Sequence, residues 1–143
     1  MISMATIYEA LITILEAIES GGSAVFDVQK TQYEASIVYK APGLFVTPGM
    51  YYERPDGFIP VDLHNVYTVE IVDKCYIKDI NDKLVSFETN IGLISATIHA
   101  NRTMDSNCYD TKITAGLSAV SKLESGEVEL RCPLQLDCLG IRS

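Results

Sequence analysis

The residues of this sequence that could perform chemistry are four cysteines and two histidines, and their spacing favours none of the usual reactions. Cys132 and Cys138 form the closest cysteine pair, six residues apart on one face of a predicted strand. Six residues of extended chain span about 20 Å, which is too far for a shared zinc ion or a disulfide bond. We therefore predict no metal site, and we expect the thiols to be buried as small apolar side chains.

The two histidines stand apart from each other and from the cysteines. His64 lies close to Asp62, where a loop is expected to enter a strand, and His99 lies near the end of a predicted helix. Histidine can act as a general acid or base because its ordinary pKa is about 6.5. A histidine in the last helical turn also meets the negative end of the helix dipole, and a surface position explains His64. We expect neither residue to be catalytic.

The sequence carries no motif of a known reaction class. It has no G-x-S-x-G, no phosphate-binding G-K-[ST] loop and no H-E-x-x-H. Gly21 and Gly22 follow a predicted helix rather than a strand, so we interpret them as the end of that helix. Asp79 and Asp82 are interpreted as helix-start residues rather than as an acid and a base. We expect a protein that is not an enzyme, with no catalytic residue, no cofactor and no metal ion.

Charge excludes a large class of function. The chain has 19 acidic and 11 basic residues, a net charge of −8, and the basic residues are scattered singly. Duplex nucleic acids are bound by clusters of lysine and arginine, so a nucleic-acid-binding module is not expected. An acidic surface usually only keeps a protein soluble. The alternative interpretation is a surface past which a polyanion slides without sticking.

No segment is expected to target or span a membrane. Residues 1–6 lack the basic start followed by a long apolar run that a secretory signal requires. No apolar stretch approaches the roughly 20 residues of a bilayer-spanning helix. We expect a protein made in a cytoplasm, without a membrane partner.

Two amphipathic helices are predicted from the spacing of apolar residues. The first runs from about Thr6 to Glu19 and starts with a capping-box pattern formed by Thr6 and Glu9. The second follows residues 79–82 and ends near Asn101. Each helix carries one apolar stripe. The stripes consist of Ile7, Leu11, Ile14, Leu15 and Ile18 in the first helix, and of Leu84, Phe87, Ile91, Ile94 and Ile98 in the second.

Alternating or β-rich runs predict strands at 24–28, 32–39, 43–47, 66–77, 108–120 and 126–141. The first two suit a hairpin, and the long strand at 66–77 is expected in the middle of the sheet. Asp73 on its apolar face indicates either a bulge or the point where the strand outruns the core. Together these elements predict a single α+β domain over 1–143, with a mostly antiparallel or mixed sheet and the two helices packed on it.

The last strand alternates most regularly. Its apolar side chains occupy every even position from Val128 to Cys138, and polar residues occupy the other face. Proline donates no ladder hydrogen bond, so Pro133 indicates an edge strand or a bulge. An open edge must be covered or used for assembly. We therefore predict an interface at Arg131 and Pro133, and we expect Arg131→Glu to weaken assembly while the monomer stays folded.

The segment at 49–62 is long for a connection. It has a Pro-Asp-Gly turn signal in its middle, and it carries residue types that are enriched in interface cores. We predict that it docks on a partner through Tyr51, Tyr52, Arg54 and Phe58. The alternative is a β-hairpin tip whose aromatic side chains pack on their own strands.

The order and size of these elements resemble the tail terminator proteins of long-tailed bacteriophages, small ring-forming proteins that stop tail-tube growth and join tail to head. The resemblance spans most of the chain and rests on several segments together. They are the opening helix at 7–15, the strand at 42–46, the long strand at 67–72, the helix through 90–94 and the closing pair of strands.

The resemblance implies a non-enzymatic structural protein of the virion, assembled in the host cytoplasm. It would form a homomeric, typically hexameric ring at the tail–neck junction. Its partners would be copies of itself, the tail tube protein and a neck or connector protein, with DNA only passing through the channel. The family has no catalytic residues, so none is carried over.

Other classes of protein remain open at this point. One is another small neck, head–tail connector or tail-completion protein. A second is a small intracellular ligand-binding subunit, which predicts a pocket between helix and sheet near His64 and Cys75. A third is an adaptor that dimerises through its last strand.

Overall fold

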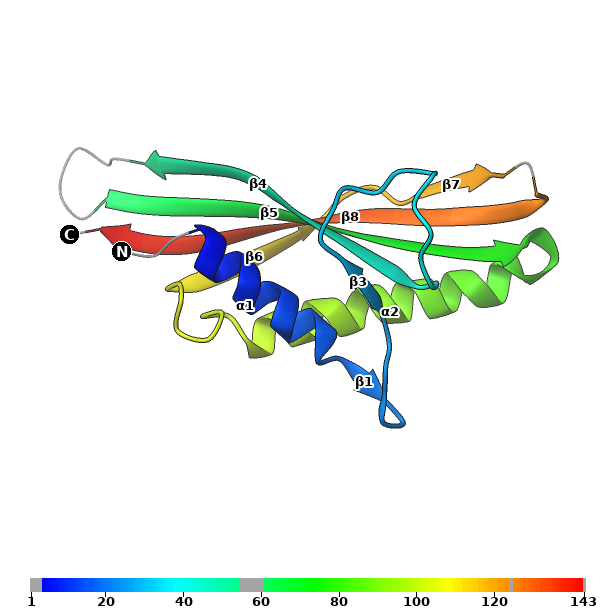
Figure 1. The fold of residues 1–143 in the computed structure, drawn as a ribbon, viewed down its shortest axis with the longest axis horizontal. Coiled ribbons are helices and arrows are strands. Elements are labelled where there is room, and N and C mark those ends of the chain that lie inside the picture. Colours follow the sequence, from blue (N-terminus) through cyan, green and yellow to red (C-terminus); the bar gives the residue numbers. More distant parts are fainter. Residues whose placement is uncertain (1–3, 55–60, 124, 143) are drawn as a thin grey trace.

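Two α-helices and eight strands make up the computed structural model, which describes residues 4–54, 61–123 and 125–142 (Figure 1). Helix α1 spans Met4–Glu16, and α2 spans Ile80–Ala100 after a 3-10 turn at Ile77–Asp79. The strands are β1 Glu19–Ser20, β2 Ser23–Ala24, β3 Asp27–Gln29, β4 Gly43–Arg54, β5 Val61–Tyr76, β6 Asp110–Ala115, β7 Ala119–Lys122 and β8 Glu127–Arg142.

The main sheet has the strand order β3-β4-β5-β8-β6, with β7 also paired to β8. All of these pairs are antiparallel except β3 with β4, which is parallel. Strands β5 and β8 pair over their full length of 16 residues. The predicted α+β class and the central place of the long strand are therefore confirmed.

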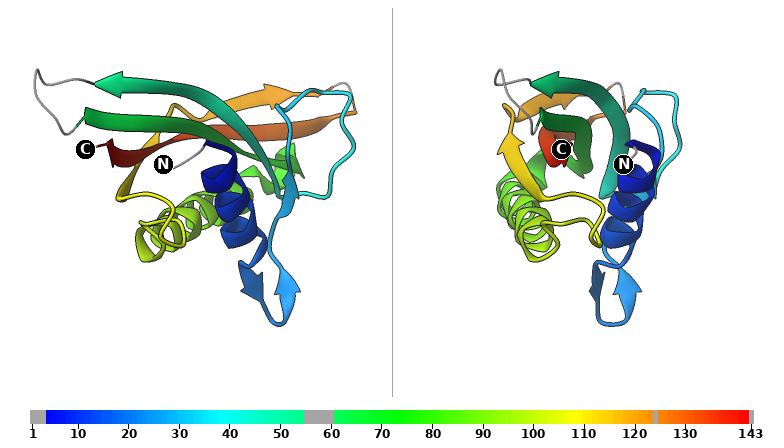
Figure 2. Two further views of the ribbon diagram at one scale, coloured as in Figure 1. Left: turned by 60° about the vertical axis from the view of Figure 1, so that its left-hand side comes forward. Right: turned by 90° about the vertical axis from the view of Figure 1, so that its left-hand side faces the viewer.

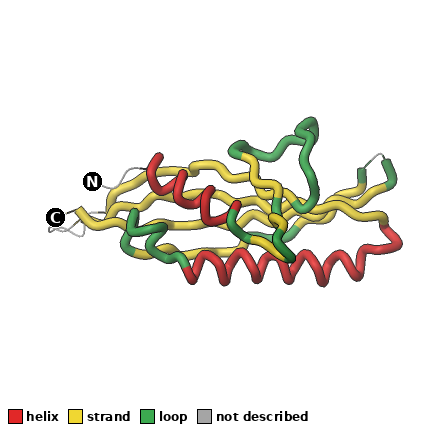
Figure 3. The backbone as a smooth tube through the Cα atoms, turned by 60° about the horizontal axis from the view of Figure 1, so that its bottom comes forward, coloured by secondary structure: helices red, strands yellow, loops and turns green. Residues whose placement is uncertain are grey.

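Both helices pack on one face of the sheet, and α2 runs along its length beside α1 (Figures 1 and 3). The predicted apolar stripes face this core: Ile7, Leu11, Ile94 and Ile98 are all fully buried. The even positions of β8 supply the opposite wall, as predicted from the alternation. Burial of each large apolar side chain contributes about 1.5–3 kcal/mol to stability, so this layer is the main hydrophobic core of the domain.

The largest fully buried side chain is that of Tyr67, whose hydroxyl donates to the Met4 carbonyl at 2.6 Å.

The predicted start and end of the first helix are wrong by a few residues. Helix α1 already includes Met4, so Thr6 lies inside the helix and does not cap it. The helix ends at Glu16, and Gly21 and Gly22 are instead the two-residue turn of the β1–β2 hairpin. Both glycines have positive φ, +61° and +83°, as this kind of tight hairpin turn requires. The hairpin projects from the body of the molecule (Figures 1 and 2).

The strand predicted at 32–39, and its hairpin with 24–28, are also wrong. Residues 30–42 form a loop that lies over the face of the sheet opposite to the helices. Tyr33 and Tyr39 pack edge-to-face on Phe45 of β4, with ring centroids 5.0 and 5.3 Å away. The alternating tyrosines thus cover the face of the sheet opposite to the helices, and their segment does not pair as a strand.

The predicted strand at 108–120 is divided by a bulge. Ala115 of β6 is opposite Leu134, whereas Ala119 of β7 is opposite Arg131. Three residues of one strand therefore lie opposite two of the other, which is the count of a β-bulge. Gly116 N–H donates to the Pro133 carbonyl at this point, 2.7 Å away.

The predicted edge position of β8 is wrong, because β8 lies between β5 and the β6–β7 pair. The bulge alternative for Pro133 is correct. Since the Pro133 carbonyl faces the bulge, its nitrogen faces the same side, where the neighbouring ladder is already interrupted. The N–H group that proline lacks would therefore point toward the bulge, where no regularly paired strand offers a carbonyl acceptor.

Asp73 marks no bulge, because β5 pairs with β8 continuously through Asp73 and Leu130. Its carboxylate is buried and lies 3.6 Å from Lys83 Nζ in the first turns of α2. The polar residue on the apolar face thus marks where α2 begins to cover the sheet.

Candidate functional site

The segment predicted as a docking loop belongs mostly to a β-hairpin. Strand β4 continues to Arg54, and β5 begins at Val61. The ladder between them shifts register once, between Pro48 and Met50. We call the paired stretch beyond this shift the β4–β5 arm, residues 50–54 and 61–66. The hairpin alternative is therefore correct for this part, and Phe58 lies outside the described residues.

One aromatic side chain of the arm packs on its own strands. The ring of Tyr52 stacks on His64 of β5, with centroids 4.5 Å apart and an interplanar angle of 2°. His64 Nδ1 in turn lies 2.9 Å from the Asp137 carboxylate on β8. This row across three strands fixes the His64 ring and gives it a structural role. Its other nitrogen, Nε2, is buried and has no hydrogen-bond partner within the described chain.

The sheet is open on both sides at the level of the arm. On one side, β3 pairs only with Gly43–Phe45 of β4, and the Tyr8 hydroxyl donates to the next carbonyl, that of Val46, at 2.7 Å. From Thr47 onward, β4 forms the rim of the sheet. On the other side, β6 and β7 end the strand order of the described chain.

The two rims lie at the same height on the sheet. Thr47 pairs with Thr68, which pairs with Gln135, which pairs with Thr114 of β6. A second row likewise joins Met50 of β4 to Lys112 of β6. The stretch β4-β5-β8-β6 is therefore a four-stranded sheet with an open edge on each side.

Exposed apolar side chains gather at both rims. Met50 on β4 is 57% exposed, and Leu117 in the bulge between β6 and β7 is 92% exposed. The unpaired backbone groups of an edge strand can pair with another chain, and exposed apolar side chains beside such an edge mark a surface for association. The further exposed apolar residues of the rims are Tyr51 and Tyr52 on β4, and Tyr109 and Val120 on the β6–β7 side.

Arg131 and Pro133 lie away from the arm, near the middle of β8. Arg131 Nη2 lies 2.8 Å from Glu70 Oε1, and its guanidinium lies 4.6 Å from the centre of the Tyr33 ring. Pro133 faces the bulge in the neighbouring strand. The five predicted interface residues that the structure describes thus form no single surface: Tyr51, Tyr52 and Arg54 share the arm, while Arg131 and Pro133 belong to the body.

The pocket predicted near His64 and Cys75 is wrong for a simple reason. The two residues are eleven positions apart on β5, so they point to opposite faces and are separated by roughly 35 Å of strand.

A cavity of about 450 Å³ does lie between α1 and α2, lined mainly by threonine, isoleucine, alanine and leucine, with Glu19 as its one charged residue. Within the described chain, no three His, Cys, Asp or Glu side chains come together to hold a metal ion.

The other sequence-based assignments can also be located. Asp79 is the N-cap residue of α2, and Asp82 lies in its first turn. His99 lies in the last turn of the same helix, where its charged form would meet the helix dipole. All four cysteines are buried and free. Sequence spacing missed the contact between Cys108 and Cys138, because it depends on how the loop after α2 folds back on β8.

Comparison with known proteins adds no relative. The sequence matches no protein-family model, and no curated protein matches it. Neither helix in the described parts of the chain has the length and apolar run needed to cross a membrane.

Proposed function

We propose that this protein is a non-enzymatic structural subunit of a bacteriophage virion, which forms a homomeric ring that caps the tail tube and joins it to the neck. The observation that carries the proposal is the four-stranded stretch that is open on both sides at the same level. The resemblance to tail terminators supports a position for this assembly at the tail–neck junction. The net charge of −8 fits a channel wall past which DNA slides.

The directions of the two rims permit head-to-tail assembly into a ring. Because β4, β5, β8 and β6 alternate in direction, β4 and β6 run opposite to each other. A second copy can therefore place its β4 beside β6 of the first in antiparallel register, without being turned over. Such head-to-tail contacts use two different surfaces of each subunit, and they close into a ring when the rotation allows it.

The experiment is to measure the mass of the purified protein by light scattering and to image it by negative-stain electron microscopy. The wild-type protein is expected to form rings with a central hole. Met50→Lys on one rim and Leu117→Lys on the other should each give folded monomers, since a lysine on an edge strand opposes strand pairing. Val85→Lys, at an exposed position on α2, is the matched control and should still form rings.

A mixture of the two rim variants tests the head-to-tail arrangement directly. Each variant keeps one intact rim, so the Met50→Lys and Leu117→Lys subunits should pair once, as a one-to-one dimer that cannot grow. A wild-type protein that stays monomeric at high concentration contradicts the ring. A dimer formed by either variant alone indicates instead a two-fold interface, as the adaptor alternative predicts.

A further inference from the structure

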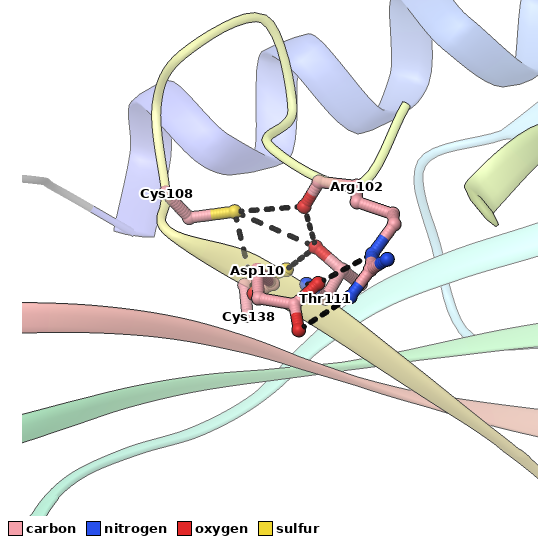
Figure 4. A network of polar contacts seen from close by, with 5 residues as sticks. All are labelled: Arg102, Cys108, Asp110, Thr111 and Cys138. Atoms are coloured by element: carbon pink, nitrogen blue, oxygen red, sulfur yellow. Dashed lines mark hydrogen bonds and ion pairs between the residues drawn. The ribbon is translucent and has the colours of Figure 1, made fainter. Parts of the chain in front are cut away.

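Two thiols face a single hydroxyl group at the junction between α2 and the sheet (Figure 4). Cys108 Sγ lies 3.4 Å from Thr111 Oγ1, and Cys138 Sγ lies 3.5 Å from the same oxygen. Thr111 and Cys138 are direct partners across β6 and β8. Cys108 comes from the loop that precedes β6, so the pair joins this loop to the middle of the sheet.

The neighbouring groups hold the loop in place around these thiols. The Thr111 hydroxyl donates to the Arg102 carbonyl at 2.7 Å, and the Cys108 thiol lies 3.5 Å from the same carbonyl. The Arg102 guanidinium binds the Asp110 carboxylate through two hydrogen bonds, of 2.8 and 2.9 Å. The Arg102 carbonyl and the Asp110 carboxylate therefore hold the two ends of the loop together beside Cys138.

The loop also stores backbone strain. Met104, Asp105 and Ser106 have φ values of +48°, +58° and +65°. A left-handed conformation costs roughly 1–2 kcal/mol for a residue other than glycine, and strain of this kind persists only where the surroundings impose it. Three such residues in a row are held in this conformation by the contacts of the loop, among them those of the fully buried Met104.

The thiols of this pair differ in acidity. Contact with Cys138 is the main cause that lowers the pKa of Cys108, against the opposing effect of burial. Contact with Cys108 and burial raise the pKa of Cys138. One sulfur is thus the better nucleophile, and the other is positioned to resolve a mixed disulfide.

We propose that Cys108 and Cys138 form a redox-active dithiol that closes into a disulfide bond when the protein meets a small-molecule disulfide. The Cys108 thiolate attacks one sulfur of oxidised glutathione, and one glutathione leaves as its thiolate. The Cys138 sulfur then loses its proton to that thiolate and attacks Cys108, which releases the second glutathione as a thiolate. This second thiolate takes up from water the proton that Cys108 lost when it ionised. Two electrons pass from the protein to the reagent, and two glutathione thiols are formed.

The other cysteines offer no such pair. The hydrogen-bond partners of Cys132 Sγ within the described chain are the carbonyls of Gly116 and Pro133, and neither is a thiol. Cys75 lies at the far end of β5, opposite Val128.

The proposed bond would tie the loop after α2 to β8. Its use in a particle that leaves a reducing cytoplasm rests on the proposed function, whereas the reaction itself does not.

The test is to incubate the folded full-length protein with oxidised glutathione and to record its intact mass and a peptide map without reduction. The expected product has lost two hydrogen atoms and carries a cross-link between Cys108 and Cys138. The melting temperature should rise by about 5 °C and return on reduction. Cys138→Ser should stop the reaction at a glutathione adduct on Cys108, while Cys75→Ser and Cys132→Ser should still close the bond.

Three outcomes would overturn the proposal. One is an unchanged mass in a protein whose four thiols all alkylate after unfolding. Another is a cross-link that joins a different pair, and the third is a stable glutathione adduct on the wild-type protein. The result on the wild-type protein decides the test by itself, so a folding defect in a serine variant would not affect it. None of these results depends on whether the protein forms rings.

Discussion

Arg131 and Glu70 form an ion pair across β5 and β8, with 2.8 Å between Nη2 and Oε1. The guanidinium also lies over the Tyr33 ring, so the loop at 30–42 partly covers it. The alternation of β8 placed Arg131 on a charged outer face, but in the folded chain its charge is already compensated within the monomer. This changes what its substitution is expected to do.

Arg131→Glu is expected to lower the free energy of unfolding by about 2–3 kcal/mol, less than for a fully buried pair because Arg131 is partly exposed. The new carboxylate would lie beside Glu70 and the buried Glu129. Urea unfolding of the variant measures this effect. Ser86→Glu on α2, which is exposed and lies away from both rims, is the control and should change stability by less than about 0.5 kcal/mol. Unchanged stability with lost assembly would restore the expectation made from the sequence.

The bulge opposite Pro133 predicts coupling between two small substitutions. A Cβ added at Gly116 would lie 2.7 Å from Pro133 Cγ and 3.1 Å from the Pro133 carbonyl oxygen. Gly116→Ala should therefore destabilise the protein by about 1–3 kcal/mol. In the background of Pro133→Ala, which removes Cγ, the same change should cost about half as much. Equal costs in both backgrounds, measured by urea unfolding, would mean that the backbone and not the proline ring sets the limit.

Gly22→Ala should loosen the β1–β2 hairpin without unfolding the core. Alanine at a φ of +83° costs about 1–2 kcal/mol. Hydrogen exchange at the Val25 N–H, which donates to Ile18 at 3.0 Å, should then accelerate by roughly 5- to 30-fold. Gly22→Asn is the matched variant, since asparagine tolerates this conformation and should exchange more slowly than alanine. Equal acceleration at core amides such as those of β5 would contradict a local effect.

Alkaline pH should destabilise the protein through Tyr33. Burial and then the hydrogen bond to Glu129 raise the pKa of Tyr33 to about 12, against about 10 in an unfolded chain. The folded state therefore holds this proton more tightly, and the associated stability, present below pH 10, is lost as the pH rises toward 12. Urea unfolding over this range should show the decline. Tyr33→Phe should decline less steeply, and an identical slope would assign the effect to other groups.

Periodicity in the sequence was sufficient to predict which faces of the long helices and strands are apolar. The apolar positions of β8 are buried as predicted, and so are Phe87, Ile94 and Ile98 of α2 and the β5 residues Tyr67, Val69, Ile71 and Cys75, because side-chain direction follows from local backbone geometry. The same local patterns failed at 32–39, where the alternation of Tyr33 and Tyr39 serves packing on Phe45. A short alternation of apolar residues does not reveal whether the segment pairs with a neighbouring strand or packs on the face of a sheet.

The candidate site was predictable only in part. Residue types identified the arm at Tyr51 and Tyr52, since exposed aromatic and methionine side chains near a turn are unusual for a connection. The second rim was not foreseen, because Leu117 lies in a bulge whose existence depends on Pro133 in another strand. The thiol pair was missed because Cys108 and Cys138 are thirty positions apart.

The sequence by itself determined which side of each helix and long strand is apolar, and hence an α+β domain with its helices on one face. Only the tertiary structure decided which strands lie at the edges of the sheet. A local pattern records burial above and below a strand, whereas an edge depends on a neighbour supplied from far along the chain. Pro133 signalled an interruption in hydrogen bonding, but the fold of β6 and β7 decided that this interruption is a bulge beside a central strand.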